Sequence, residues 1–240
     1  LKAIWIDQEV RDDAERRGYT VVDAPTIIAT HLTEVIKRHA AEILGRQEVQ
    51  QLIDNVKNDY PAVVNEIVEK MSVGEIQKIM QNLLKERVSI RNTITIFETL
   101  ASYVDYTKDA GLLTEYVRGA LARQITKDYL GAENSLSVIT VDPEIETIIR
   151  NSIHDDPIEG KILALDPNSH EQITNSLLDA YNRCSNMGYS PIYLVSPHIR
   201  SVTFTLLERE IMAPIVLSYN EITSNIQVNV VVSALLSNAA

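Results

Sequence analysis

Residues 45–130 form a nearly unbroken series of amphipathic segments, and this series constrains the fold more than any other feature. Its apolar residues recur at steps of three and four, which is the period of one face of an α-helix. The series predicts four or five helices separated by short breaks. Each helix would have one apolar face, so none is expected to be stable alone, and the helices must pack on each other or on a partner. The apolar rows are Val49, Leu52, Ile53, Val56 and Tyr60; Val73, Ile76, Ile79, Met80, Leu83 and Leu84; Ile90, Ile94, Phe97, Leu100, Ala101 and Val104; and Leu112, Leu113, Tyr116, Val117, Leu121 and Ile125.

Polar residues mark where these helices are expected to begin. Ser72 and Glu75 have the spacing of a capping box, in which each side chain satisfies a backbone N–H of the first turn. Ser89 is the expected N-cap of the following helix, and Thr107 or Asp109 that of the next.

After Gly131 the pattern changes to alternating strands and helices. Runs of β-branched and apolar residues predict strands, and Asp142-Pro143, Pro167 and Pro197 are expected to open the helices between them. This alternation is typical of an α/β domain with a mostly parallel sheet. The last eight residues are expected to form a loose tail. The predicted strands cover residues 136–141, 161–166, 191–196, 214–222 and 226–232.

Residues 1–43 are interpreted as a partial α/β segment. A charged helix ends at Gly18, a short strand covers 19–24, and Pro25 opens a helix that reaches residue 44. One strand cannot close a core, so its partners are expected elsewhere. The fold class is therefore α+β and multidomain, with a central all-helical subdomain at 44–131 and an α/β subdomain with a mostly parallel sheet at 132–240.

The charge of the chain disfavours nucleic-acid binding. The net charge is −11, and residues 132–240 hold 13 acidic and five basic side chains. The single cysteine, Cys184, excludes an intrachain disulfide and a cysteine zinc cage. The sequence also contains no run of about 20 apolar residues that would predict a membrane span.

Candidate catalytic and metal-binding residues are few. His154 with Asp155 and Asp156 could form a metal loop, but a solvated acidic loop is favoured because no further ligands can be placed. His198 follows a predicted strand without a glycine-rich phosphate loop, and Cys184 has no histidine partner near it in the sequence. We therefore expect no enzyme, no catalytic residue, no bound metal and no cofactor.

A helical DNA-binding regulator is a less favoured alternative. Lys85, Arg87 and Arg91 lie near a short break between two predicted helices, as in a helix-turn-helix. Glutamates are interleaved with them, and residues 44–131 carry 11 basic and 12 acidic side chains. A near-neutral helical face of this kind is more typical of a protein-contact or solvated surface.

Several segments occur in an order that chance would rarely produce: "VVDAPTIIATHL", "GRQEVQQL", "SIRN", "ETLASY", "LLTEYVR" and "VLSYNEI". Together they resemble the C-terminal cytoplasmic region of the FlhA family, the export-gate proteins of bacterial flagellar type III secretion. The resemblance covers nearly the whole chain. Export gates of injectisomes are the alternative, but the first and last of these segments look more flagellar.

The resemblance implies a binding platform rather than an enzyme. Family members combine a multi-span membrane domain with four cytoplasmic subdomains, which assemble into a nine-membered ring on the cytoplasmic face of the inner membrane. The ring receives flagellar export chaperones with bound substrates and communicates with the export ATPase complex. No nucleic acid is involved, and membrane contact is made only through the N-terminal domain. The start at Leu1 fits a piece that lacks this domain and much of the first two subdomains.

The same resemblance implies a chaperone–substrate binding site in "VVDAPTIIATHL". Its expected residues are Asp23, Thr26 and Thr30, at the lip of a cleft between the first two subdomains. The alternative is that these residues serve only the local geometry of a strand end and a helix start. Subdomain hinges are expected near Gly45 and Gly131. Without its missing neighbours, the apolar face around Ile28 and Leu32 is expected to be exposed.

Overall fold

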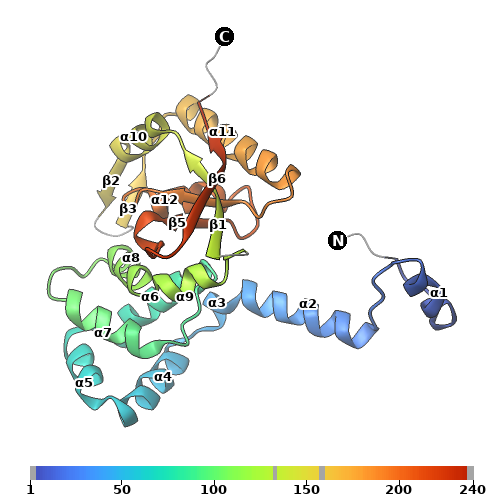
Figure 1. The fold of residues 1–240 in the computed structure, drawn as a ribbon. Helices are drawn as coiled ribbons and strands as arrows, with labels where there is room; N and C mark the ends of the chain where they lie inside the picture. Colours follow the sequence, from blue (N-terminus) through green and yellow to red (C-terminus); the bar gives the residue numbers. More distant parts are fainter. Residues whose placement is uncertain (1–3, 132–133, 157–159, 237–240) are drawn as a thin grey trace.

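The helical series predicted for residues 45–130 is present in the computed structural model, which describes residues 4–131, 134–156 and 160–236. Figure 1 shows this series as the lower half of the molecule, beneath a sheet and its helices. It contains more helices than the four or five expected, because Tyr60 and Leu121 each separate two short helices. The helices are α4 (Arg46–Asp59), α5 (Pro61–Lys70), α6 (Val73–Lys85), α7 (Thr93–Tyr103), α8 (Ala110–Ala120) and α9 (Ala122–Lys127).

Most of the predicted helix starts are confirmed. Ser72 and Glu75 form the full capping box of α6, and the Asp109 carboxylate accepts a hydrogen bond from the Leu112 N–H at the start of α8. The prediction for Ser89 was wrong. Asn92 is the N-cap of α7, since its side-chain oxygen accepts a hydrogen bond from the Thr95 N–H, and Arg87 turns the preceding loop with φ of 58°.

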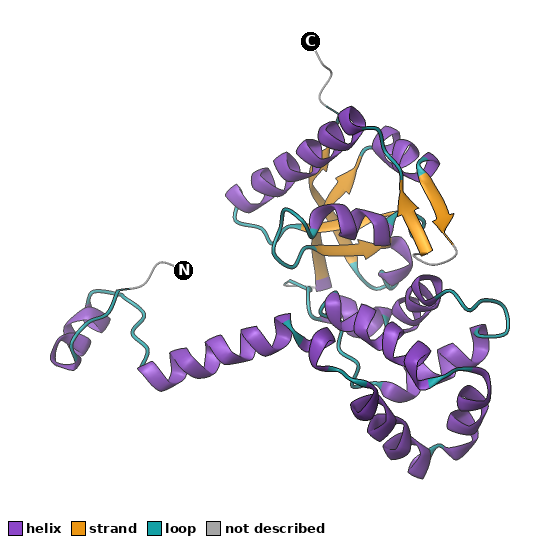
Figure 2. Cartoon of the chain, turned by 180° about the vertical axis from the view of Figure 1, so that it is seen from behind, coloured by secondary structure: helices purple, strands orange, loops and turns teal. Residues whose placement is uncertain are grey.

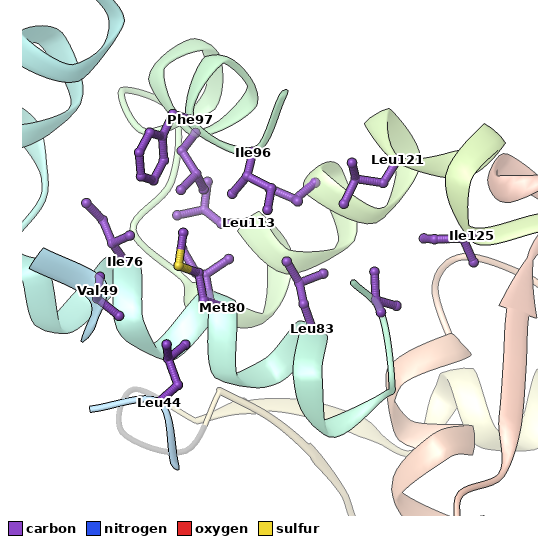
Figure 3. Packing of buried hydrophobic residues seen from close by; sticks show 14 of the residues in the cluster. Leu44, Val49, Ile76, Met80, Leu83, Ile96, Phe97, Leu113, Leu121 and Ile125 are labelled. Atoms are coloured by element: carbon purple, nitrogen blue, oxygen red, sulfur yellow. The ribbon is translucent and has the colours of Figure 1, made fainter. Parts of the chain in front are cut away.

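One apolar core unites these helices, and it continues into the sheet. Ile76, Met80, Leu83 and Leu113 are fully buried at its centre (Figure 3). The same cluster includes residues from one face of the strands described next: Leu136, Val138, Ile192, Leu194 and Leu217. The helical and α/β parts therefore share a core.

The main sheet has four strands, all parallel, in the order β5-β4-β1-β6. Strand side chains alternate between its faces. Ile192 and Leu194 point to the shared core, while Tyr193 and Val195 join a second core formed with helices on the other face. Figure 2 shows the sheet between the two helical layers. The strands are β1 (Ser135–Val141), β4 (Ile192–Val195), β5 (Ile215–Ser218) and β6 (Gln227–Ala234); the helices are α10 (Pro143–Asn151), α11 (Pro167–Asn186) and α12 (Arg200–Leu207).

Several boundaries in the α/β part differ from the sequence prediction. The strand expected at 161–166 is β3 (Gly160–Leu163), which pairs antiparallel with β2 (Ile153–Asp156) in a separate two-stranded sheet. The acidic loop expected at His154 is thus part of a strand. The fourth predicted strand ends at Ser218 and is followed by a 3-10 helix, η3 (Tyr219–Glu221). Although Pro197 was expected to open a helix, α12 begins at Arg200.

The predicted tail begins too early. Ser233 and Ala234 belong to β6, and Ala234 is fully buried in the second core. The Asp142 N–H donates a hydrogen bond to the Ala234 carbonyl, which fixes the end of this strand beside β1. Residues 237–240 of the predicted tail lie outside the described residues.

The N-terminal segment forms an arm that projects from the body (Figure 1). It contains η1 (Gln8–Val10), α1 (Arg11–Arg16), α2 (Ala24–Arg38) and α3 (Ala40–Ile43). The strand expected at 19–24 is not formed, because residues 19–23 have no sheet to join within the described chain. Gly18 lies two residues after the end of α1 and has a φ of 86°, a conformation that favours glycine.

The α+β class predicted from the sequence is confirmed: an all-helical part is followed by an α/β part with a parallel main sheet. None of the helices within the described ranges combines the length and apolarity needed to traverse a lipid bilayer.

Candidate protein-interaction site

The three residues expected to bind chaperone–substrate complexes lie together on the first two turns of α2. The Asp23 Oδ1 atom accepts a hydrogen bond of 3.1 Å from the Thr26 N–H, so Asp23 is the N-cap. The Thr30 hydroxyl donates 2.8 Å to the Thr26 carbonyl. All three side chains are exposed. Their contacts are therefore local, and their outward faces remain open to a partner.

The start of α2 carries a stable negative charge. Hydrogen bonds from Thr26 lower the pKa of the Asp23 carboxyl below its ordinary value, and the nearby Arg11 guanidinium contributes in the same direction. A carboxylate at a helix N-terminus is also favoured by the helix dipole. This end of the arm thus presents an ionised acid beside two threonines.

An apolar row follows along the same helix. Ile28, Leu32 and Ile36 recur at steps of four, and their exposed fractions are 66%, 55% and 49%. Three large aliphatic side chains in one exposed row form a patch of the kind that marks protein-interaction surfaces. The exposure expected from the sequence is present in the structure.

The arm is held to the body near its C-terminal end. The Arg87 guanidinium lies 3.5 Å from the Glu34 carboxylate, and Arg38 Nη2 lies 3.1 Å from the Met212 sulfur. Beyond α2, α3 packs on α6, and the side chains of Gln77 and Gln81 both donate to the Leu44 carbonyl at 3.0 Å. The body therefore anchors α3 firmly, while the N-terminal turns of α2 extend away from it (Figures 1 and 2).

A buried charge cluster joins the helical and α/β parts. Arg200, at the start of α12, is fully buried. Its Nε donates 2.7 Å to Glu115 Oε2 on α8, and its Nη2 donates 3.0 Å to Glu86 Oε1 at the end of α6. These charge-assisted contacts join three elements from the two parts of the chain.

Arg118 extends this cluster to the sheet. Its Nη1 donates 3.0 Å to Glu86 Oε2, and its Nη2 lies 2.6 Å from the Glu221 carboxylate of η3. The second Glu221 oxygen accepts 2.6 Å from the Ser218 N–H at the end of β5. We call Glu86, Glu115, Arg118, Arg200 and Glu221 the junction cluster.

The charges of the junction cluster stabilise one another. Burial favours the neutral form of Glu86, but Arg200 and Arg118 outweigh this effect and lower the pKa of Glu86 below its ordinary value. Burial likewise opposes the charge of Arg200, yet Glu86 and Glu115 raise the pKa of its guanidinium well above the ordinary value. Glu86 and Arg200 are therefore both held in their charged forms.

Sequence reasoning missed this cluster. One available signal was Arg118, which lies on the buried stripe of α8 beside Val117 and before Leu121. A second was Arg200 at the start of a helix that contains no other charged residue. Neither signal identifies a partner, because Arg200 and Glu86 are separated by more than 100 residues and only the fold brings them together.

The other residues considered from the sequence do not converge. His198 lines a shallow cleft with Arg150 and Lys161, and Cys184 lies on α11 with its side chain buried in the second core. Lys85 forms an ion pair of 2.8 Å with Glu208. Within residues 4–131, 134–156 and 160–236, no three His, Cys, Asp or Glu side chains are grouped as metal ligands would be.

Fold and site together define a multi-part scaffold with an exposed helical arm. The helical and sheet parts are joined by a shared core and the junction cluster, and the apolar row of α2 is left to solvent. The sequence matches the model of the FHIPEP family over residues 1–227, and the chain belongs to this family.

Among curated relatives, the flagellar biosynthesis protein FlhA of Borreliella burgdorferi is 44% identical over 230 residues, which are 96% of this chain and 33% of the relative. FlhA of Bacillus subtilis is 44% identical over 229 residues, 95% of this chain and 34% of the relative. The chain therefore spans about a third of the length of these relatives.

Solved structures agree with the fold. The CdsV protein of Chlamydia pneumoniae superimposes with a TM-score of 0.88 at 28% identity, covering 98% of this chain and 67% of CdsV. The nonameric EPEC SctV-C superimposes with a TM-score of 0.82 at 30% identity, covering 94% of this chain and 68% of that one.

Proposed function

We propose that the chain is part of a docking platform of a bacterial flagellar type III export gate, and that it binds proteins rather than catalysing a reaction. This proposal rests on the exposed row of α2, a helix that also carries Asp23, Thr26 and Thr30 at its start, on another face. A platform must present apolar surface to its cargo, and this row does so on a helix that extends from the body.

The cargo on this proposal is a flagellar export chaperone with its bound substrate. The apolar row would supply buried area. Asp23, Thr26 and Thr30 lie on another face of the helix, so they would hydrogen-bond a part of the partner that reaches around α2.

The flagellar assignment rests on sequence similarity. Relatives named FlhA are 33–44% identical to the chain, whereas the injectisome-type structures are 26–31% identical. An injectisome export gate is the alternative. The two assignments can be separated by producing the full-length protein in cells that lack the flagellar export gate and in cells that lack the injectisome export gate. Export should return only in the cells whose missing gate the protein can replace.

Solved relatives support the ring and show that one of them binds another protein. SctV-C and EscV are described as nonameric, and CdsV has been solved in complex with CdsO. We propose that this chain takes part in a nine-membered ring and communicates with the export ATPase complex.

Relay of cargo to the channel would use hinge motion. The shared core and the junction cluster make movement at Gly131 costly, because opening there would expose buried charges and apolar surface. We place the hinge instead where α2 meets α3, next to His39. The reason is that α2, which precedes His39, makes few contacts with the body.

Calorimetry with an export chaperone, empty and loaded with its substrate, tests the docking proposal. Leu32→Glu should abolish binding by placing a charge in the apolar row. Thr30→Ala should weaken it, while Thr33→Ala is the matched control, because its hydroxyl makes the same 2.8 Å bond to a carbonyl four residues earlier. Asp23→Asn keeps an N-cap and removes only the charge.

Equal effects of Thr30→Ala and Thr33→Ala would show that local helix geometry alone is affected. Unchanged binding by Leu32→Glu would move the docking site off α2 and contradict the proposal.

A further inference from the structure

A solvent-open groove is lined by residues of α7 and α8 and by Asn220 of η3. Figure 1 shows α7 and α8 in the helical part of the body. The groove has a volume of about 450 Å³. It is separate from the arm, since none of its lining residues belongs to α2. The residues used in the argument are Glu98 and Tyr103 of α7, Glu115, Tyr116 and Gly119 of α8, and Asn220 of η3.

Two tyrosine rings form one wall of the groove. Tyr103 and Tyr116 stack with ring centroids 4.1 Å apart and an interplanar angle of 12°. Their exposed fractions are 39% and 37%. Both rings line the groove and are partly exposed, so part of their aromatic surface can meet a ligand. A free aromatic face attracts cations through its quadrupole, so this wall favours a positively charged ligand.

The charged side chains that line the groove also favour a positively charged ligand. Its lining includes two carboxylates and no lysine, arginine or histidine. The Glu115 carboxylate already accepts hydrogen bonds from Arg200 beneath it. The Glu98 carboxylate is exposed and makes no ion pair with any residue in the described part of the chain. Glu98 is therefore the carboxylate that remains available to a bound cation.

The floor of the groove is free of side-chain bulk. Gly119 lies on α8 one turn after Tyr116, and a Cβ atom placed there would meet no atom within 4 Å. Glycine is unfavourable inside a helix, and no neighbouring atom requires a residue without a side chain at position 119. This absence of a side chain leaves room for the aliphatic stem of a long side chain lying against α8.

We propose that this groove binds a lysine or arginine side chain from an extended basic segment of a partner protein. The stem lies over Gly119, the cationic group faces Glu98, and the exposed tyrosine surface covers it. The net charge of −11 on the whole chain favours encounter with such a basic partner. This surface is additional to the docking surface on α2, and its test does not depend on that proposal.

Fluorescence anisotropy with a labelled peptide of alternating arginine and alanine tests the groove. Glu98→Gln should weaken binding about fivefold, and Tyr116→Leu about two- to fivefold, which are typical losses for a single exposed ion pair or cation–π contact. Gly119→Leu should block the floor and reduce binding by at least about tenfold. A peptide with glutamine in place of arginine should not bind.

Two variants serve as matched controls. Glu171→Gln removes the same charge from an exposed position on α11, outside the groove, and should leave binding nearly unchanged. Gly119→Ala adds only a methyl group and should bind almost as the unmodified chain does. Far-UV circular dichroism and thermal unfolding confirm that each variant is folded.

Equal losses for Glu98→Gln and Glu171→Gln would show general attraction to an acidic protein and would overturn the proposal. Unchanged peptide binding by Gly119→Leu would do the same. Sedimentation velocity adds a further criterion: if Gly119→Leu instead disrupts self-association of the chain, the occupant is a second copy and the proposed partner is wrong.

Discussion

Arg200 illustrates how one residue can hold two parts of a chain together. Its guanidinium is fully buried and contacts Glu86 at the end of α6 and Glu115 in the middle of α8. Arg200→Met should lower the free energy of unfolding by about 3–5 kcal/mol, because it leaves the partly buried Glu115 carboxylate without its partner and Glu86 with Arg118 alone. Urea unfolding at neutral pH, followed by circular dichroism, measures the loss.

Arg183→Met is the control for this prediction. Arg183 is about half exposed and pairs with Asp179 on the same helix at 3.0 Å. The loss expected there is below about 1 kcal/mol, since solvent screens an exposed pair. Similar losses at both positions would contradict the role assigned to Arg200.

Glu86 gives the junction cluster a defined response to acid. Its pKa is lower in the folded chain than the ordinary value of about 4.3 expected when unfolded. Its stabilisation is therefore complete above that ordinary value and is lost as the pH falls towards the folded pKa. Urea midpoints measured from neutral pH down to about pH 3 should fall steeply for the unmodified chain and less steeply for Glu86→Gln. An identical acid slope in both would contradict this assignment.

At the scale of elements, the start of α6 is set by Ser72 and the start of α7 by Asn92. Ser72→Ala should cost about 1 kcal/mol, because it removes the hydroxyl that accepts from the Glu75 N–H. Ser89→Ala should cost clearly less, since Ser89 lies three residues before the N-cap of α7. Thermal unfolding of the two variants makes the comparison, and equal costs would restore Ser89 as a cap.

These two serines also show where sequence reasoning succeeds. Ser72 and Glu75 satisfy each other within one turn, so their spacing alone identifies the helix start. The turn before α7 instead depends on Arg87 at positive φ and on the Gln124 side chain, which donates to the Ser89 carbonyl. Gln124 lies on α9, and no local pattern could have placed it there.

In the sheet and the candidate site too, local sequence patterns predicted some features, whereas other features depend on contacts between distant parts of the chain. Alternating apolar runs predicted β1 and β4 well, because both faces of these strands are buried. The strand expected at 19–24 failed because local propensity is not enough without neighbouring strands. For the site, resemblance indicated Asp23 and Thr30, whereas the junction cluster depends on contacts across the fold.

At the scale of the whole molecule, the helical and α/β parts should behave as one unit. The apolar cluster around Leu83 and Leu113 continues into Leu136 and Leu194, and the junction cluster spans the same boundary. Separating the parts would expose both the apolar surface and the charges, so a partial opening at Gly131 would have a high free-energy cost. The arm has no comparable attachment, because the row of α2 is exposed.

Native-state hydrogen exchange tests this division directly. Amides in α6, α8, β1 and β4 should exchange with one common free energy of opening, equal to that of global unfolding, because these elements share a core. Amides in the N-terminal turns of α2 should exchange far faster. In Arg200→Met the common value should fall for both parts together. If only the α/β amides lost protection in this variant, the two parts would be separate folding units, and a hinge at Gly131 would again be the better explanation of any relay.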